Sequence, residues 1–132
     1  MASIFTRIVA GEIPCYNIAE NEHYLAFLDI NPLARGHTLV IPKTETDYIF
    51  DMEDESYLGL WRFAREVALA IGSTIPCAKV GVAVIGLEVA HAHIHLVPVN
   101  GIFDIDFSKP KLKFSPEEFS EIARLIGSAL EV

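Results

Sequence analysis

The stretch that decides the fold is Ala90-His91-Ala92-His93-Ile94-His95-Leu96-Val97, in which histidine alternates with small or apolar residues. Successive side chains of a β-strand point to opposite faces, so this alternation predicts a strand over residues 92–99 with the histidines on one face. The other face is apolar and can pack into a core. The three imidazoles must then line a cleft or a polar layer, which makes them the candidate site.

The rest of the chain predicts an α+β fold. Hydrophobic periodicity and turn residues indicate three helices and four further strands. The helices are expected at residues 4–10, 53–74 and 115–129, and the strands at 16–20, 24–30, 37–41 and 79–85. Short connections favour a five-stranded antiparallel sheet with a long central helix and a C-terminal helix. We expect one domain over residues 1–132, because no linker or repeat interrupts the chain.

Composition limits the partners. The 132 residues are 52% hydrophobic, and 18 acidic against 10 basic residues give a net charge of −8. An acidic surface disfavours binding to a nucleic acid polymer or to an anionic membrane. No apolar run approaches the roughly 20 residues that span a bilayer. Residues 1–14 do not resemble a signal peptide, and Cys15 and Cys77 suit a reducing compartment, so we expect a cytoplasmic protein.

Three interpretations of the histidine row remain open from the residues alone. The row could be the wet face of a sheet, although three histidines in strict alternation make this the weakest interpretation. It could supply metal ligands, with His37 as a fourth and Glu88 as the nearest carboxylate in sequence. It could also carry a nucleophile, since mutual repulsion keeps most of the rings neutral.

The chain resembles the histidine triad (HIT) family. The family signature is His-φ-His-φ-His-φ-φ, with φ apolar, and residues 91–97 match it at every position. Three upstream blocks also match in the expected order, at residues 3–14, 25–32 and 36–43. The resemblance covers residues 3–99 and is strongest to the nucleoside phosphoramidase branch. The segment from Gly101 onward is not diagnostic.

The resemblance implies a nucleotide hydrolase or transferase without a cofactor. Such enzymes act on the α-phosphate of nucleoside phosphoramidates or dinucleoside polyphosphates through a nucleotidyl-histidine intermediate. His93 would be the nucleophile, and His95 would contact the phosphate oxygens. His91 would orient the His93 ring, partly through its backbone carbonyl. His37 matches the histidine that lies beside the triad.

The resemblance also implies a substrate-binding set. Asp29 would accept hydrogen bonds from the ribose hydroxyls, and its alternative is an exposed carboxylate at a strand end. The remaining candidates are apolar residues for the base and the stretch before the triad: Ile30, Phe5, Ile8, Leu28, Glu88 and Val89. Many members have glutamine where this chain has Leu87, which puts leaving-group recognition in doubt. With so acidic a chain, the anion would be held by imidazoles and backbone N–H groups, helped by Lys43 or Arg35.

Two further expectations concern metal and partners. Some bacterial members bind a structural zinc through an N-terminal Cys-x-x-Cys, and Ser3 and Thr6 occupy those places here, so no such zinc is expected. Members of the family pair as homodimers through the long helix and a sheet edge. Apolar flanks of the helix over residues 53–74 agree with this: Leu60, Phe63 and Leu69.

The alternatives to an enzyme are a non-catalytic nucleotide-binding protein, which Leu87 motivates, and a metal-binding protein that uses the histidine row. A DNA-end processing role is the least favoured, because the chain has no basic patch.

Overall fold

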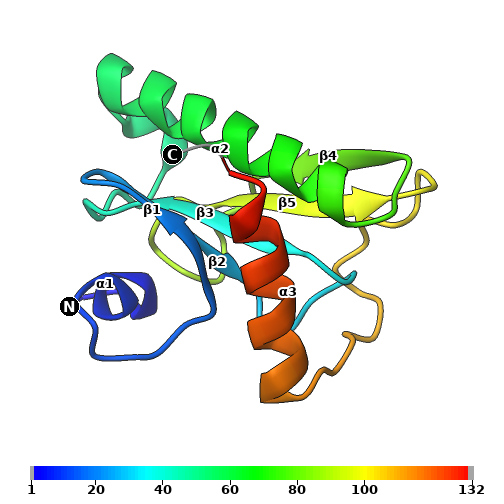
Figure 1. The fold of residues 1–132 in the computed structure, drawn as a ribbon. Coiled ribbons are helices and arrows are strands. Elements are labelled where there is room, and N and C mark those ends of the chain that lie inside the picture. Colours follow the sequence, from blue (N-terminus) through cyan, green and yellow to red (C-terminus); the bar gives the residue numbers. More distant parts are fainter. Residues whose placement is uncertain (1, 131–132) are drawn as a thin grey trace.

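The computed structural model describes residues 2–130 and is built on a five-stranded antiparallel sheet (Figure 1). The strands are β1 (Asn17–Glu20), β2 (Tyr24–Leu28), β3 (Thr38–Pro42), β4 (Lys79–Ala83) and β5 (Ile94–Val99), in the order β1-β2-β3-β5-β4. The helices are α1 (Ile4–Val9), α2 (Asp54–Thr74) and α3 (Pro116–Ser128), with a short 3-10 turn η1 (Ile49–Asp51). The predicted fold class is confirmed.

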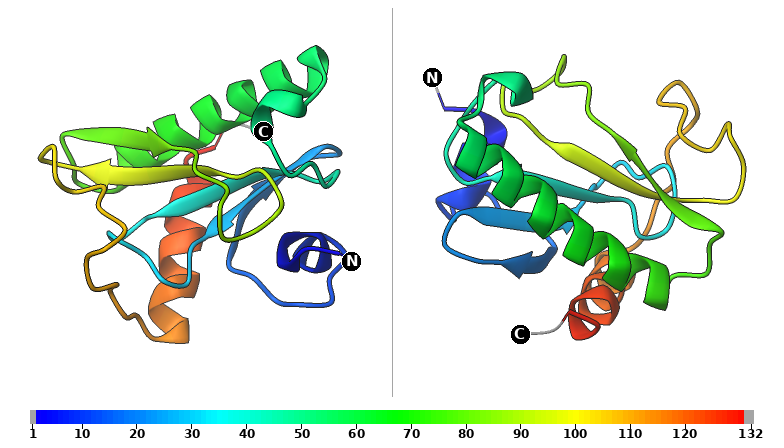
Figure 2. Two further views of the ribbon diagram at one scale, coloured as in Figure 1. Left: turned by 180° about the vertical axis from the view of Figure 1, so that it is seen from behind. Right: turned by 90° about the horizontal axis from the view of Figure 1, so that it is seen from above.

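The sheet has two different faces. One face packs against α2 and α3 in the larger core, to which Leu28, Val40 and Leu96 contribute. The opposite face carries a smaller apolar cluster around Phe27 and Leu39, and Phe5 of α1 packs against it. Figures 1 and 2 show α1 on the side of the sheet away from α2. Because α1 is short, it leaves much of this second face of the sheet uncovered, and the histidines of the triad lie there.

The strand that carries the triad is shorter than expected. β5 begins at Ile94, so only His95 of the three histidines lies within it. The N–H group of Ala92 donates to the carbonyl of Thr46 at 2.7 Å, outside the ladder that joins β3 and β5. The expectation of one strand carrying all three histidines is therefore wrong. His91 and His93 belong to the extended segment that enters the strand.

Two other strands also end early. β2 stops at Leu28 because the next residue, Asp29, turns the chain: its Oδ1 accepts the N–H of Asn31 at 2.8 Å. β4 stops at Ala83, which pairs with His95. The two strand ends lead into different loops, residues 29–37 and 84–93, and both loops contribute to the wall of the candidate site.

The long helix buries more of its surface than the sequence predicts. Leu60 and Phe63 were expected on an exposed flank but are buried, because the sheet and α3 both pack against α2. Leu69 is exposed as expected, and Leu58 is exposed too. Neither α2 nor any other described helix is long and apolar enough to cross a membrane.

A glycine sets the start of β3. Gly36 has a φ of 93°, a conformation that other residues rarely adopt. A Cβ atom at this position would lie 3.0 Å from Cγ1 of Ile75. Glycine therefore allows the chain to pass close to Ile75 and deliver the next residue, His37, to the buried side of the loop.

Candidate functional site

A cavity of about 490 Å³ lies beside α1 and the ends of β2 and β5. His93 and His95 line it, together with Asp29. The structure also brings every other predicted substrate-binding residue to its wall: Ile30, Phe5, Ile8, Leu28, Glu88 and Val89. His37 and His91 do not line the cavity. They lie behind it, buried, and each contacts one of the two lining histidines.

Backbone contact assigns the proton of His93. Its Nδ1 lies 2.8 Å from the carbonyl oxygen of His91, and a carbonyl can only accept. Nδ1 therefore carries the hydrogen in the neutral ring, and Nε2 carries a lone pair. Among the described residues Nε2 has no hydrogen-bond partner, while Phe5 packs edge-on against the ring at a centroid distance of 5.0 Å. The ring thus has a free nucleophilic nitrogen at a cavity wall.

His91 is held at both ring nitrogens. Its Nε2 lies 2.8 Å from the carbonyl oxygen of Pro42, so Nε2 carries the hydrogen. Its Nδ1 accepts from the hydroxyl of Ser3, also at 2.8 Å. Burial lowers the pKa of His91, which keeps the ring neutral. Both contacts fix the residue whose carbonyl orients His93.

A hydrogen-bond network extends from His91 to the surface. The hydroxyl of Thr6 donates to Oε1 of Glu45 at 2.7 Å, and the N–H group of Ser3 donates to the same oxygen. Hydrogen bonds from Ser3 and Thr6 lower the pKa of Glu45 to about 2. The two residues that replace the zinc-binding cysteines therefore form, with Glu45, a support for His91.

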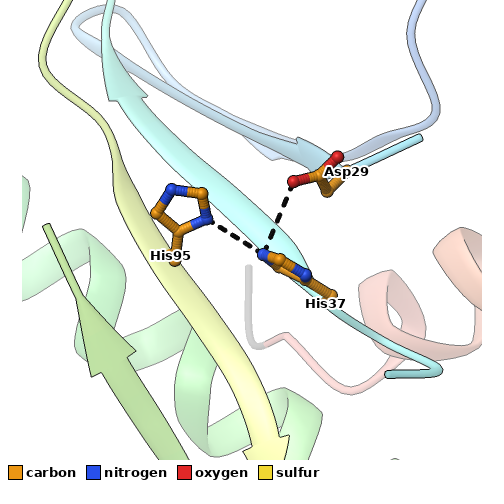
Figure 3. A group of neighbouring side chains, drawn as sticks. All are labelled: Asp29, His37 and His95. Atoms are coloured by element: carbon orange, nitrogen blue, oxygen red, sulfur yellow. Dashed lines mark hydrogen bonds and ion pairs between the residues drawn. The ribbon is translucent and has the colours of Figure 1, made fainter. Parts of the chain in front are cut away.

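A second chain of hydrogen bonds holds His95 (Figure 3). The backbone N–H of Leu33 donates to Nδ1 of His37 at 3.0 Å, so Nε2 of His37 carries the hydrogen. That nitrogen lies 3.0 Å from Nδ1 of His95, which must accept. The neutral His95 ring therefore carries its own hydrogen on Nε2. His95 is a donor where His93 is an acceptor.

Asp29, His37 and His95 also form the kind of group that could hold a metal ion, since their ligand atoms lie within 4.8 Å of one another. The hydrogen assignment does not fit this use. Nε2 of His37, which carries the hydrogen, lies 3.0 Å from Nδ1 of His95 and 3.5 Å from Oδ2 of Asp29, and a metal ligand needs a lone pair there. The contacts fit a hydrogen-bond chain better than a ligand set.

Burial keeps the two histidine rings of this group uncharged. It lowers the pKa of His37 to about 3 and that of His95 to about 4, with mutual repulsion among the rings acting in the same direction. Burial also raises the pKa of Asp29, against the hydrogen bond from Asn31. His37 therefore lies 3.5 Å from Oδ2 of Asp29 as a neutral ring, and the two residues do not form an ion pair.

These shifts predict a pH-dependent stability. The unfolded chain binds more protons than the folded one below pH 6.5, so stability is complete above that pH and is lost as the pH falls toward 4. The free energy of unfolding should drop by about 1.4 kcal/mol per pH unit for each ring, or about 2–4 kcal/mol for the pair at pH 5. Urea denaturation at pH 7, 6 and 5 measures this change.

The matched variants are His37→Gln, which should flatten the slope by up to one proton, and His23→Gln, which should leave it unchanged because His23 is exposed. A free energy of unfolding that stays constant between pH 7 and 5 would contradict the assignment.

Among the lining residues that sequence reasoning missed, Phe107 and Lys111 come from the loop between β5 and α3. No periodicity or motif marks this loop, although a lysine in an acidic chain is a usable signal. The two cations that were expected to assist lie elsewhere. Lys43 is paired with Glu20 at 2.7 Å, and Arg35 is exposed; neither lines the cavity.

The site and fold define a histidine triad protein. Residues 10–101 match the HIT domain family. The chain belongs to this family.

Similar proteins agree in sequence and in shape. The chain is 34% identical to the adenosine 5'-monophosphoramidase hnt1 of Schizosaccharomyces pombe, over 99% of this chain and all of that protein. A Hit-like protein from Bartonella henselae superimposes with a TM-score of 0.85 at 27% identity, covering 97% of this chain and 96% of that one. A zinc-bound histidine triad protein from Mycobacterium smegmatis gives 0.82 at 32% identity, covering 98% and 93%.

Proposed function

We propose that this protein hydrolyses nucleotide conjugates, in the manner of a nucleoside phosphoramidase, through a nucleotidyl intermediate on His93. The observation that carries the proposal is the hydrogen on Nδ1 of His93, which donates to the carbonyl of His91 at 2.8 Å. It leaves the Nε2 lone pair free at the cavity wall. A neutral imidazole with one free nitrogen is a competent nucleophile, and the S. pombe relative is named a monophosphoramidase.

The opposite state of His95 supports the same reaction. Its Nε2 carries a hydrogen, and its ring centroid lies 4.9 Å from that of His93. A donor beside a nucleophile can stabilise negative charge on the phosphate oxygens as the bond to phosphorus forms. His93 would therefore offer a lone pair, and His95 a hydrogen-bond donor, to the same phosphate group of the substrate.

The cavity has the dimensions and walls that a nucleoside monophosphate needs. A volume of about 490 Å³ falls within the range of small-molecule sites. Asp29 would accept the ribose hydroxyls, and apolar residues such as Ile8 and Leu28 would contact the base. Glu88 is exposed at the rim, so its carboxylate can remain in water, away from the phosphate.

The reaction then takes two steps. Nε2 of His93 attacks the α-phosphorus, and the bond from phosphorus to the leaving nitrogen or oxygen breaks with its electron pair. The leaving group takes up a proton from solvent. Water next attacks the same phosphorus and loses a proton to solvent, the bond to His93 breaks with its electron pair returning to Nε2, and the nucleoside monophosphate is released. His91 keeps the Nδ1 hydrogen in place throughout.

The test is to trap the intermediate. Adenosine phosphoramidate is mixed with the protein, the reaction is stopped with acid-free denaturant within milliseconds to seconds, and the intact mass is measured. We expect the added mass of one adenylyl group, located on His93 by peptide mapping. AMP binding without any adduct or turnover would contradict the proposal and would favour a non-catalytic nucleotide-binding protein, for which exposed Leu87 at the cavity rim is the motivating feature.

We also propose that residues 1–132 act as a single HIT domain and that two copies pair through α2. Leu58 and Leu69 give α2 apolar surface that the single chain leaves exposed. The pairing of two copies and the binding of a small nucleotide both remain predictions.

A further inference from the structure

The loop between β5 and α3 is a built part of the cavity, although it contains no helix or strand. Side chains hold its turns: Asp104 accepts the N–H groups of Asn100 and Gly101, at 2.7 and 2.9 Å. The N–H of Leu112 donates to the carbonyl of Pro32 at 2.9 Å, which ties the loop to the turn that follows Asp29. The loop is therefore held by internal hydrogen bonds at its start and is tied at its end to the chain beside the site.

One side chain of this loop, Phe107, packs directly on the hydrogen-bond chain of His37 and His95. Its ring centroid lies 4.8 Å from that of His95 and 6.3 Å from that of His37. Phe107 also lines the cavity. The loop thus covers the side of His95 that the sheet leaves open.

Lys111 lies four residues further on and brings a positive charge to the same place. Its Nζ donates to the carbonyl oxygens of Phe107 and Lys109, at 2.5 and 3.0 Å. An ammonium group has three N–H bonds, so one remains for a ligand. The two carbonyls hold the ammonium at the cavity wall without neutralising its charge.

Among the described residues Lys111 is the only lysine or arginine that lines the cavity. The other charged lining residues are Asp29 and Glu88, both acidic. The charge of Lys111 lowers the pKa of His37 and opposes the rise in the pKa of Asp29, so it acts at short range on the group beside His95. A phosphate entering this acidic site would meet one cation.

We propose that Lys111 is the cation that receives the phosphate of the nucleotide and makes the site prefer a nucleotide to a nucleoside. The inference rests on the proposed function for the identity of the ligand. It assigns a specificity residue outside residues 10–101, the part that matches the family. A charge-assisted hydrogen bond from Lys111 would add to the neutral donor on His95, and its charge would offset that of the phosphate.

The test compares binding of AMP and of adenosine by isothermal titration calorimetry. The variant is Lys111→Met, and the matched control is Lys113→Met, which removes the same charge from an exposed position two residues away. For Lys111→Met we expect the Kd for AMP to rise about 10- to 100-fold, the range for hydrogen bonds to a charged group, with adenosine binding changed less than about two-fold. Lys113→Met should change neither value by more than about two-fold.

Lys111→Arg keeps the charge and should keep the preference for AMP. Equal weakening of AMP and adenosine binding by Lys111→Met would overturn the proposal, because it would mean that the lysine only holds the loop. An unchanged Kd for AMP would overturn it as well. The outcome is separate from that of the trapping experiment: binding reports on Lys111 whether or not His93 forms an adduct.

Discussion

Replacing the proposed nucleophile, His93→Ala, is expected to lower kcat for an adenosine phosphoramidate by about 10⁴-fold or more. The alanine has no lone pair to attack phosphorus, and water would have to react directly. KM should change little, because the other wall residues remain, Asp29 and His95 among them. Steady-state kinetics at saturating substrate measure the loss, and AMP titration shows that the pocket is intact.

The control is His23→Ala, which changes an exposed histidine that does not line the cavity. It should retain full activity. If His93→Ala kept more than a tenth of the wild-type kcat, another residue would have to be the nucleophile.

The second large effect is expected for His95→Ala. Removing the donor beside the nucleophile should lower kcat by about 10²–10³-fold, the range for loss of one donor that stabilises charge in the transition state. Substrate binding should weaken less than kcat falls, because the donor matters most as negative charge develops on the phosphate.

The hydrogen-bond chain behind His95 gives this prediction a sharper form. His37→Phe removes the group that donates to Nδ1 of His95, so the hydrogen of that ring is free to occupy either nitrogen. Its kcat should lie between those of the wild type and His95→Ala, and nitrogen NMR of the His95 ring should show a mixture of the two neutral forms. A single neutral form in His37→Phe would contradict the role given to His37.

The four histidines of the site thus have different tasks that follow from what they contact. A carbonyl acceptor fixes the hydrogen of His91 and of His93, and a backbone N–H donor fixes that of His37. Because Nε2 of His37 donates to Nδ1 of His95 at 3.0 Å, the hydrogen of the His95 ring must lie on its other nitrogen, Nε2. The four rings are chemically alike, but their contacts differ. His93 therefore presents a lone pair and His95 a hydrogen-bond donor, while His91 and His37 support them.

The network of Ser3, Thr6 and Glu45 gives a physical account of the missing cysteines. In the relative from M. smegmatis the structure contains zinc. Here the hydroxyl of Ser3 contacts His91, the first histidine of the triad, and Glu45 holds Ser3 and Thr6 in turn, by hydrogen bonds of 2.7–2.8 Å. We expect the support of His91 to need no ion, because its Nδ1 already has a donor.

The sequence predicted most of the fold. Periodicity placed the helices within one or two residues, and the capping box at Ser115 marked the start of α3. Strand ends were less accurate: β2 and β4 stop two residues early, and β5 starts two residues late. A strand ends where its backbone groups stop bonding to the neighbouring strand. The N–H group of Ala92, for example, donates to the carbonyl of Thr46 instead. No local sequence pattern encodes such a change of partner.

The sequence alone indicated the family and most of the candidate site. The alternation of histidine with apolar residues and the upstream blocks pointed to a HIT protein, and the predicted substrate-binding set of Asp29 and its neighbours lines the cavity, whereas Lys43 and Arg35 do not. Such information is local: it depends on residue type and on spacing along one segment.

Only the tertiary structure decided which nitrogen of each ring carries the hydrogen and which cation lines the cavity. His37 meets His95 across 58 positions of sequence, Ser3 meets His91 across 88, and Lys111 comes from a loop without periodicity. Contacts of this kind depend on how loops pack across the sheet edge. The spacing of residues along the chain does not predict that packing.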